Sequence, residues 1–212
     1  MDKFSEPIGN LIKQLSRLPG IGRKTAQRLT YYLLDTDDLQ VEELANALLE
    51  AKKNTKRCSI CCNYADHDPC NICSSEKRDH STICVVEQPK DLFAMEKTGQ
   101  YHGLYHVLHG VISPIKGYGP DDITLRDLLK HIGQEDIKEV IIATNPTTDG
   151  EVTANYVATL IQPLGIKVTR ISYGIPMGGD LEYYDNLTIS AALNNRVEMK
   201  KAKRYKDPSS SS

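Results

Sequence analysis

Four cysteines in two closely spaced pairs limit most strongly what this chain can form. Their spacing is Cys58-x2-Cys61-x8-Cys70-x2-Cys73. Two thiolates separated by two residues reach one metal ion from a tight turn, and two such turns complete the tetrahedral sulfur shell of a structural Zn²⁺. Few aliphatic side chains occur between the cysteines, so a bound ion replaces the missing hydrophobic core. The pattern predicts one structural zinc ion per chain.

The other two cysteines are expected to play different parts. Cys62 would form only a Cys-x3-Cys pair with Cys58, so we interpret it as a neighbour whose backbone forms the turn. Cys84 lies in an apolar run and is expected to be a small buried side chain. Five of the six cysteines crowd into one stretch, which indicates metal binding rather than a disulfide framework.

The first quarter of the chain has the periodicity of three amphipathic helices. Pro7 suits a first helical turn, and we expect the first helix to begin there and to end before Pro19. The other two helices are expected over residues 23–34 and 41–53. The predicted buried faces are Ile8, Leu11, Ile12 and Leu15; Ala26, Leu29 and Leu33; and Leu44, Leu48 and Ala51.

The segment LPGIG (residues 18–22) joins the first two predicted helices. Its glycines allow a turn that exposes backbone N–H groups at the start of the second helix, where the helix dipole also favours an anion. Arg23, Lys24 and Arg28 add positive charge on the following turns. The pattern resembles the helix-hairpin-helix motif, which binds the DNA backbone independently of sequence. The alternative is an ordinary helical hairpin whose glycines only close the turn.

From Thr82 onward, short β-branched runs alternate with helical stretches. This alternation is typical of an α/β domain, in which helices cover both faces of a parallel sheet. A Gly-rich segment over residues 174–195 predicts a loop followed by a short element. The strands are expected over residues 83–86, 105–108, 139–143 and 166–171, and the helices over 89–98, 124–132 and 151–161.

Acidic residues follow two of the predicted strands. Glu87 follows the first strand directly, and Asp149-Gly150-Glu151 follows the third after a polar turn. Because the carboxyl ends of neighbouring parallel strands open on the crevice where α/β sheets bind ligands, we expect these carboxylates to converge. The arrangement resembles a Toprim domain, whose glutamate and Asp-x-Asp motif hold Mg²⁺. Mg²⁺ often takes only one or two carboxylates, so metal binding here stays open. Asp91 is interpreted as a first-turn helix residue.

Charge is unevenly distributed along the 212 residues, whose formal net charge is −2. The two ends of the chain, residues 1–34 and 196–212, each carry six lysines and arginines and two acidic residues. Residues 81–195 carry eight lysines and arginines and fourteen acidic residues. Basic ends beside an acidic middle indicate an anionic partner, and solvated helix faces are the alternative. No apolar run is long enough to span a bilayer and no signal-peptide core is present, which predicts a cytoplasmic protein.

The order of these features resembles the RecR family of bacterial recombination mediators. The resemblance covers nearly the whole chain and is most specific in the long run over residues 143–156. The stretches that carry it are LPGIGRKTAQRL (18–29), CNIC (70–73), ICVVEQPKDLFAMEKTGQYHG (83–103), GPDDI (119–123), ATNPTTDGEVTANY (143–156) and GIPMGGDLEY (174–183). The departures are Val152, Tyr173 and a Lys-rich extension after Arg196.

The resemblance implies four segments in this chain. They are a helix-hairpin-helix region over residues 1–55, a four-cysteine zinc finger over 56–80, a Toprim domain over 81–173, and a Gly-rich segment with a basic tail over 174–212. It also implies a non-enzymatic, nucleoid-associated protein that forms ring-shaped dimers and tetramers. Members of the family act with RecO and RecF to help RecA replace single-strand-binding protein on gapped DNA.

Three groups of residues take family roles by position. Lys24 and Arg28, beside Arg23, would contact the DNA backbone, single- or double-stranded. The four paired cysteines would hold zinc. The resemblance assigns contact with RecO to an acidic Toprim surface made of Glu87, Asp149 and Glu151.

Two other classes of function use the same residues. A Mg²⁺-dependent nuclease or primase-like enzyme would employ the Toprim carboxylates, and a Mg²⁺-dependent cleavage assay separates it from a mediator. A zinc protein that reads DNA bases is a weaker alternative, because acids surround the cysteines and would repel phosphate. These acids are Asp66, Asp68, Glu76 and Asp79.

Overall fold

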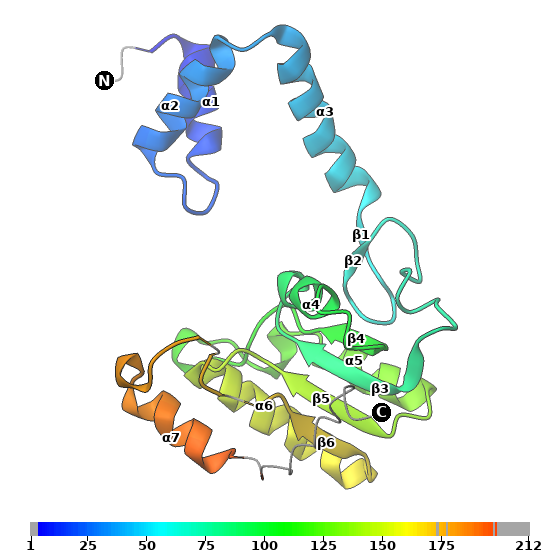
Figure 1. The fold of residues 1–212 in the computed structure, drawn as a ribbon. Coiled ribbons are helices and arrows are strands. Elements are labelled where there is room, and N and C mark those ends of the chain that lie inside the picture. The colour runs from blue at the N-terminus through cyan, green and yellow to red at the C-terminus, as the bar shows by residue number, and fades with distance from the viewer. Residues whose placement is uncertain (1–3, 173, 177, 197, 199–212) are drawn as a thin grey trace, which may run out of the picture. The chain divides into compact units, whose positions relative to one another are not determined.

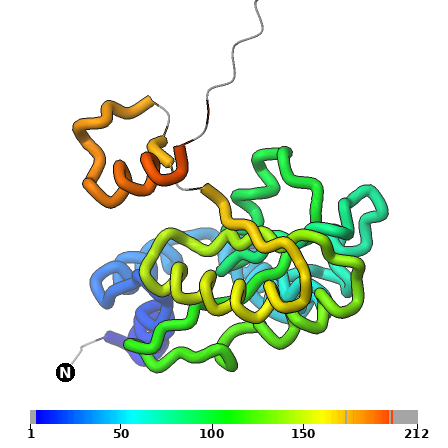
Figure 2. The backbone as a smooth tube through the Cα atoms, turned by 90° about the horizontal axis from the view of Figure 1, so that it is seen from below, coloured from blue at the N-terminus to red at the C-terminus, as the bar shows by residue number. Residues whose placement is uncertain are grey.

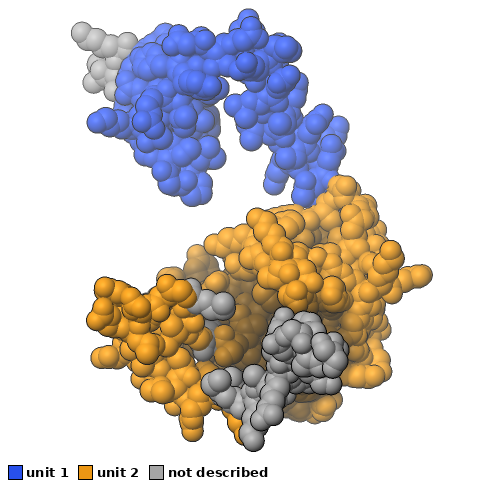
Figure 3. All heavy atoms as spheres, viewed as in Figure 1, with its two compact units in different colours: residues 1–56 blue, residues 57–212 orange. Residues whose placement is uncertain are grey.

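The computed structural model describes residues 4–172, 174–176, 178–196 and 198. The chain forms two compact units (Figure 1). Unit 1 comprises residues 1–56 and unit 2 residues 57–212 (Figure 3). The lysines and arginine of the basic tail, from Lys200 to Lys206, lie outside the described residues. No described helix is long and apolar enough to cross a membrane.

Unit 1 begins with two helices that pack on each other. Helix α1 (Glu6–Leu15) has Pro7 in its first turn, and α2 (Arg23–Leu34) starts directly after Gly22. The predicted apolar faces meet between them, where Ile12 is 5% exposed and Ala26 is fully buried. Both predicted helices are therefore confirmed, and they form the hairpin expected from LPGIG.

Helix α3 (Asp38–Asn54) begins three residues before the predicted Val41, because the Asp37 side chain caps it by accepting the N–H of Leu39. The predicted burial of its apolar face is wrong for this chain. Leu44 and Leu48 are 46% and 65% exposed, and no residue of α3 is buried. Periodicity identifies the apolar face of a helix, but it does not say whether the same chain supplies a surface to cover that face.

Unit 2 is built on a parallel sheet. The strand order is β4-β3-β5-β6, and every neighbouring pair is parallel. The strands are β3 (Asp79–Val86), β4 (Gly103–Val107), β5 (Glu139–Ala143) and β6 (Lys167–Arg170), each at a predicted position. A small second sheet pairs β1 (Lys56–Arg57) with β2 (Tyr64–Ala65) around the cysteine segment.

Helices cover both faces of the large sheet, as the sequence predicts. Alternate residues of β3 point to opposite faces: Ile83 and Val85 pack with α5 (Leu125–Gln134) and α6 (Thr148–Ile161), whereas Cys84 and Val86 pack with Leu92 of α4 (Pro89–Glu96). Cys84 is fully buried as expected, and burial raises the pKa of its thiol to about 12. The sheet is therefore the middle layer of a three-layer α/β structure.

The Gly-rich segment ends in a short element, as predicted, and the structure shows that this element is a helix. Helix α7 (Asn186–Asn194) is capped by Asp185, whose side chain accepts the N–H groups of Leu187 and Thr188. Helix α7 is the orange helix in Figures 1 and 2, and its residues Leu187, Thr188 and Ala191 line one hollow with Glu151 of α6. None of the residues of α7 is buried.

Candidate zinc centre and nucleic-acid interface

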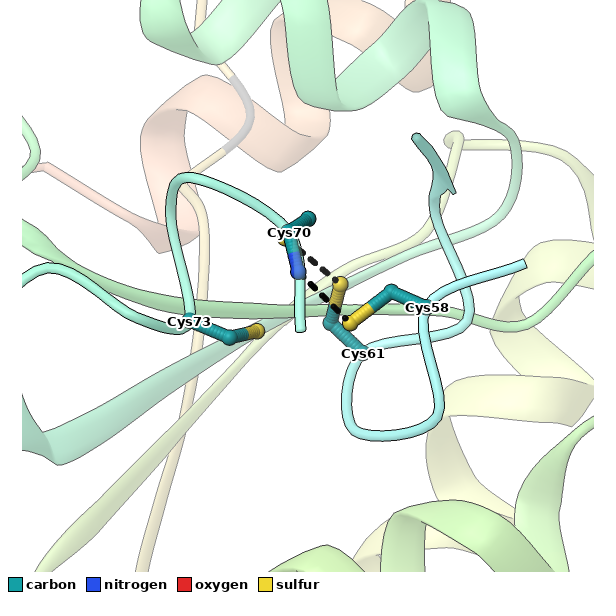
Figure 4. Close-up of side chains that lie close together, drawn as sticks. All are labelled: Cys58, Cys61, Cys70 and Cys73. Carbon is teal, nitrogen blue, oxygen red and sulfur yellow. Dashed lines mark hydrogen bonds between the residues drawn. The ribbon is translucent and has the colours of Figure 1, made fainter. Parts of the chain in front are cut away.

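The two cysteine pairs come together in one buried cluster (Figure 4). The Sγ atoms of Cys58, Cys61, Cys70 and Cys73 all lie within 4.8 Å of one another, and no one of the four residues is more than 6% exposed. Cys61 Sγ and Cys70 Sγ are 3.6 Å apart, and the Cys70 N–H donates to Cys58 Sγ over 3.4 Å. Among the described residues this is the only group of three or more Cys, His, Asp or Glu side chains close enough to share a metal ion.

The chemistry of the cluster fits zinc. Zn²⁺ takes four thiolates in a tetrahedral shell, and backbone N–H groups that point at sulfur stabilise the thiolate form. The four thiolates would hold one structural ion, which stabilises a segment with little apolar core of its own.

Cys62 lies beside the cluster and turns the chain. Its φ angle is 61°, in the left-handed region, and its N–H donates to the Cys58 carbonyl over 3.0 Å. Cys62 does not belong to the metal-binding group. Its backbone therefore closes the turn that carries the first two cysteines, in line with the interpretation from spacing.

The cysteine segment is fastened to the end of β4. The Val107 N–H donates to the Cys61 carbonyl over 2.9 Å, and His109 Nε2 lies 2.6 Å from the Cys62 carbonyl oxygen, which makes Nε2–H the donor. The Tyr64 ring meets the His109 ring edge-on at 5.3 Å. Sequence reasoning gave no part to His109, because a lone histidine carries no spacing signal.

The hairpin of unit 1 presents its basic residues to solvent. Gly20 adopts a φ of 79°, which a side chain would strain, and the Ile21 N–H donates to the Leu18 carbonyl to close the turn. Gly22 caps α2 without a side-chain hydrogen bond. The first N–H groups of α2 therefore point outward beside a positive helix end.

All three predicted DNA-binding side chains lie on α2. Arg23, Lys24 and Arg28 are exposed, and Lys24 and Arg28 share one helical face because they are four residues apart. Positively charged side chains and uncapped backbone N–H groups therefore face solvent at the start of α2, where they can bind an extended anion.

The predicted Toprim residues lie at the carboxyl ends of β3 and β5. Glu87 follows β3 and accepts two hydrogen bonds from Asn145, one from its backbone N–H and one from Nδ2, both over 2.7 Å. Gly150 permits this approach: a Cβ there would lie 2.1 Å from the Asn145 carbonyl oxygen and 2.9 Å from Glu87 Oε1. The Glu87 segment and the Asp149–Glu151 segment therefore meet.

Asp149 and Glu151 each face a cation that sequence reasoning missed. Lys116 Nζ donates to Asp149 over 3.0 Å and lowers the pKa of that carboxyl. Arg170, at the end of β6, donates to Glu151 over 2.7 Å and to Thr144 Oγ1 over 2.8 Å. Strand β6 lies next to β5 in the sheet, so Arg170 and Glu151 lie at the same edge. Their proximity follows from the order of the strands in the sheet.

Asp91 is a capping residue, as expected. Its side chain accepts the Gln88 N–H over 2.9 Å at the start of α4. We therefore leave it out of the Toprim edge, which we define as Glu87, Asn145, Asp149 and Glu151 with the cations Lys116 and Arg170.

These features define a class: a DNA-binding protein that joins a helix-hairpin-helix unit to a four-cysteine zinc finger and a Toprim sheet. Four family models match in this order: the RecR helix-hairpin-helix over residues 8–52, the RecR four-cysteine zinc finger domain over 55–75, the Toprim domain over 81–172 and the RecR C-terminal region over 174–197.

Curated relatives agree with the family models. Recombination protein RecR of Desulfitobacterium hafniense (strain DSM 10664 / DCB-2) is 54% identical over 92% of this chain and 98% of its own length. Recombination protein RecR of Carboxydothermus hydrogenoformans is also 54% identical, over 91% of this chain and 97% of its own length. The chain belongs to the RecR family of recombination proteins.

Proposed function

We propose that this chain is a non-enzymatic mediator of recombinational DNA repair. It binds DNA backbone through the hairpin, assembles into a ring of dimers or tetramers, and acts with RecO and RecF to help RecA replace single-strand-binding protein on gapped DNA. Membership of the RecR family supports the recombination role. The observation that carries the DNA contact is the exposed pair Lys24 and Arg28 beside the uncapped start of α2.

The DNA contact is independent of sequence. Cations and backbone N–H groups at a helix start recognise phosphate, and no base-reading element is needed for that contact. Binding therefore depends on salt, because each neutralised phosphate releases counterions.

The variant Lys24→Ala/Arg28→Ala tests this contact. It should weaken binding about equally for all DNA sequences and lower the salt dependence, by about 0.9 in the log–log slope for each duplex phosphate that is no longer neutralised. Both side chains are exposed, so folding should change little. The control variant Lys52→Ala/Lys53→Ala removes the same charge from the last turn of α3. Wild-type affinity of the hairpin variant at moderate salt would show that the hairpin is not the DNA surface.

The Toprim edge is the proposed contact surface for RecO. Glu87, Asp149 and Glu151 carry negative charge at one edge of the sheet, and the Lys116 side chain that faces Asp149 is 65% exposed. Exposed ion pairs contribute only about 0–1 kcal/mol, so a basic side chain of a partner can replace Lys116 at small cost. Complementary charge then supplies specificity and a high association rate.

Glu87→Ala and Glu151→Ala test this surface. Each should reduce capture of RecO while zinc content, oligomeric state and most DNA binding stay unchanged. Glu139→Ala is the matched control, because it removes an acid from the opposite end of β5. Unchanged capture of RecO by both edge variants would leave these acids with a structural role only.

The enzyme alternative has a direct test on the same variants. The pure protein is incubated with DNA, Mg²⁺ and nucleotides, and strand cleavage and primer synthesis are measured. A mediator leaves the DNA intact and makes no primer. An activity that Glu87→Ala and Glu151→Ala abolish would instead place the chain among Toprim enzymes.

A further inference from the structure

A hollow of about 410 Å³ lies on the hairpin of unit 1 and is lined by positive side chains. Five of its lining residues belong to α1 or follow it, and one starts α2. They are Gly9, Ile12, Lys13, Ser16, Arg17 and Arg23. Lys24 and Arg28 do not line it, but Arg23, the third predicted DNA-binding residue, does, so the hollow adjoins the predicted DNA-binding surface of α2.

The cations come from both helices of the hairpin. Lys13 and Arg17 are four residues apart and share one side of α1 and its C-terminal end, whereas Arg23 is the first residue of α2. Arg17 Nη1 donates to Gln14 Oε1 over 3.2 Å, a contact that uses one of the five N–H donors of a guanidinium. Three cationic groups thus surround one concave surface.

The floor of the hollow leaves room for a ligand. Gly9 has no side chain, and a Cβ built there would meet nothing within 4 Å. Ile12 is 5% exposed, and the Ser16 hydroxyl donates back to the Ile12 carbonyl over 2.7 Å. Helix α1 and the Ser16 that follows it therefore form the wall, while the space next to Gly9 is open.

Within the described part of the chain, no acidic side chain lines this hollow; Glu6, in the first turn of α1, lines an adjoining hollow that shares Gly9 and Lys13 with it. Three cations on one concave surface attract an anion, and guanidinium groups match the geometry of phosphate oxygens. We propose that Lys13 and Arg17 form, around the shared Arg23, a second binding site for DNA backbone phosphate, so that the strand runs from α2 across the end of α1. This inference rests on the proposed DNA-binding function and lengthens its contact surface.

The test compares three double variants of the full chain, each lacking two positive charges of unit 1. They are Lys13→Ala/Arg17→Ala in the hollow, Lys24→Ala/Arg28→Ala on α2 and Lys52→Ala/Lys53→Ala on α3. Fluorescence anisotropy of a labelled single-stranded oligonucleotide is measured over a range of salt concentrations. The hollow variant should lower the log–log salt slope by about 1.4 for each bound chain, because two phosphate contacts on a single strand account for about 0.7 each. The α3 control should bind like the wild type.

A second pair of variants acts on the hollow without removing a cation. Gly9→Glu places a carboxylate over the floor and should weaken binding, whereas Gly9→Ala adds only a methyl group to open space and should leave binding unchanged. Circular dichroism checks that both keep their helix content. Glycine is a poor helix residue, so neither change threatens α1.

The outcomes separate this inference from the proposed function. Normal binding by the hollow variant together with weak binding by the α2 variant overturns the second site and keeps the hairpin contact. Normal binding by both variants overturns the two proposals together. An equal loss in the α3 control shows a general charge effect and also overturns the second site.

Discussion

The cysteine segment and the parallel sheet lie in the same compact unit but are stabilised differently. The sheet buries a cluster of aliphatic side chains with α5 and α6 on one face, and Cys84, Val86 and Leu92 with α4 on the other. In the cysteine segment the buried cluster is the four cysteines, and only Ile60, Ala65 and Ile72 pack half-buried against them. The sheet is held by the hydrophobic effect, whereas the cysteine segment depends on a metal ion.

The two regions meet at β4. Ile72 packs against both the cysteine cluster and the sheet core, and the hydrogen bonds from Val107 and His109 end on the carbonyls of Cys61 and Cys62. A short segment without its own core is thereby fixed on a large one. The comparison predicts that loss of zinc unfolds the first region and leaves the second largely folded.

The largest expected effect is that of Cys73→Ser. Structural zinc contributes about 10–16 kcal/mol of apparent binding free energy in small peptides, so losing one ligand should release the ion and unfold the cysteine segment. Cys62→Ser is the matched control, because Cys62 lies outside the metal-binding group. Metal analysis and hydrogen exchange at residues 57–75 measure the effect. Zinc loss in Cys62→Ser with retention in Cys61→Ser would reverse the ligand assignment.

Leu92→Ala should act on the sheet instead. Leu92 is fully buried between α4 and the sheet, and removing such a side chain costs about 2–5 kcal/mol in the free energy of unfolding. Urea unfolding measures the loss, and metal analysis should still find one zinc ion per chain. Release of zinc by this variant would show that the two regions are not stabilised separately.

Acid should weaken the sheet through a buried histidine. Burial lowers the pKa of His106 to about 4, and the ring stays neutral with Nε2 near the Thr124 carbonyl at 3.0 Å. In the unfolded chain this histidine binds its proton near pH 6.5. The contribution of neutral His106 to the free energy of unfolding is therefore fully present above that pH and is lost as the pH falls towards 4, a loss of about 3 kcal/mol in all. Burial also lowers the pKa of the neighbouring His131, which adds to the trend.

Urea unfolding of the sheet between pH 7.5 and pH 4.5, in buffer with excess zinc, measures this slope. His106→Leu should flatten it, since the variant has no proton to gain at this position. An unchanged slope in His106→Leu would assign the acid sensitivity to other groups, such as the zinc-binding thiolates.

The smallest expected effect is that of His109→Ala, which removes one of the links between the two regions. A single hydrogen bond contributes about 0.5–1.5 kcal/mol net, so the variant should keep its zinc and lose about 1 kcal/mol of stability. Faster hydrogen exchange should appear at residues 57–75 while β3 and β5 stay protected. Exchange that is equally fast throughout unit 2 would mean that the cysteine segment supports the whole sheet.

Local patterns in the sequence were enough to predict most of the fold. Spacing identified the four clustered cysteines and excluded Cys62, and alternation identified all four strands of the parallel sheet. Hydrophobic periodicity placed α1 and α2, and the glycines of LPGIG placed the turn between them. These predictions succeeded because thiolate spacing, strand periodicity and turn conformation depend on residues only a few positions apart.

The remaining features depend on contacts between distant residues. The order β4-β3-β5-β6 brings Arg170 to Glu151, and the loop after β4 brings Lys116 to Asp149 and His109 to Cys62. The exposure of the apolar face of α3 is another such feature: the residue pattern of this helix is that of a buried helix, yet none of its residues is buried. A sequence shows which side chains are charged or apolar, but only the packed chain shows which surface each one meets.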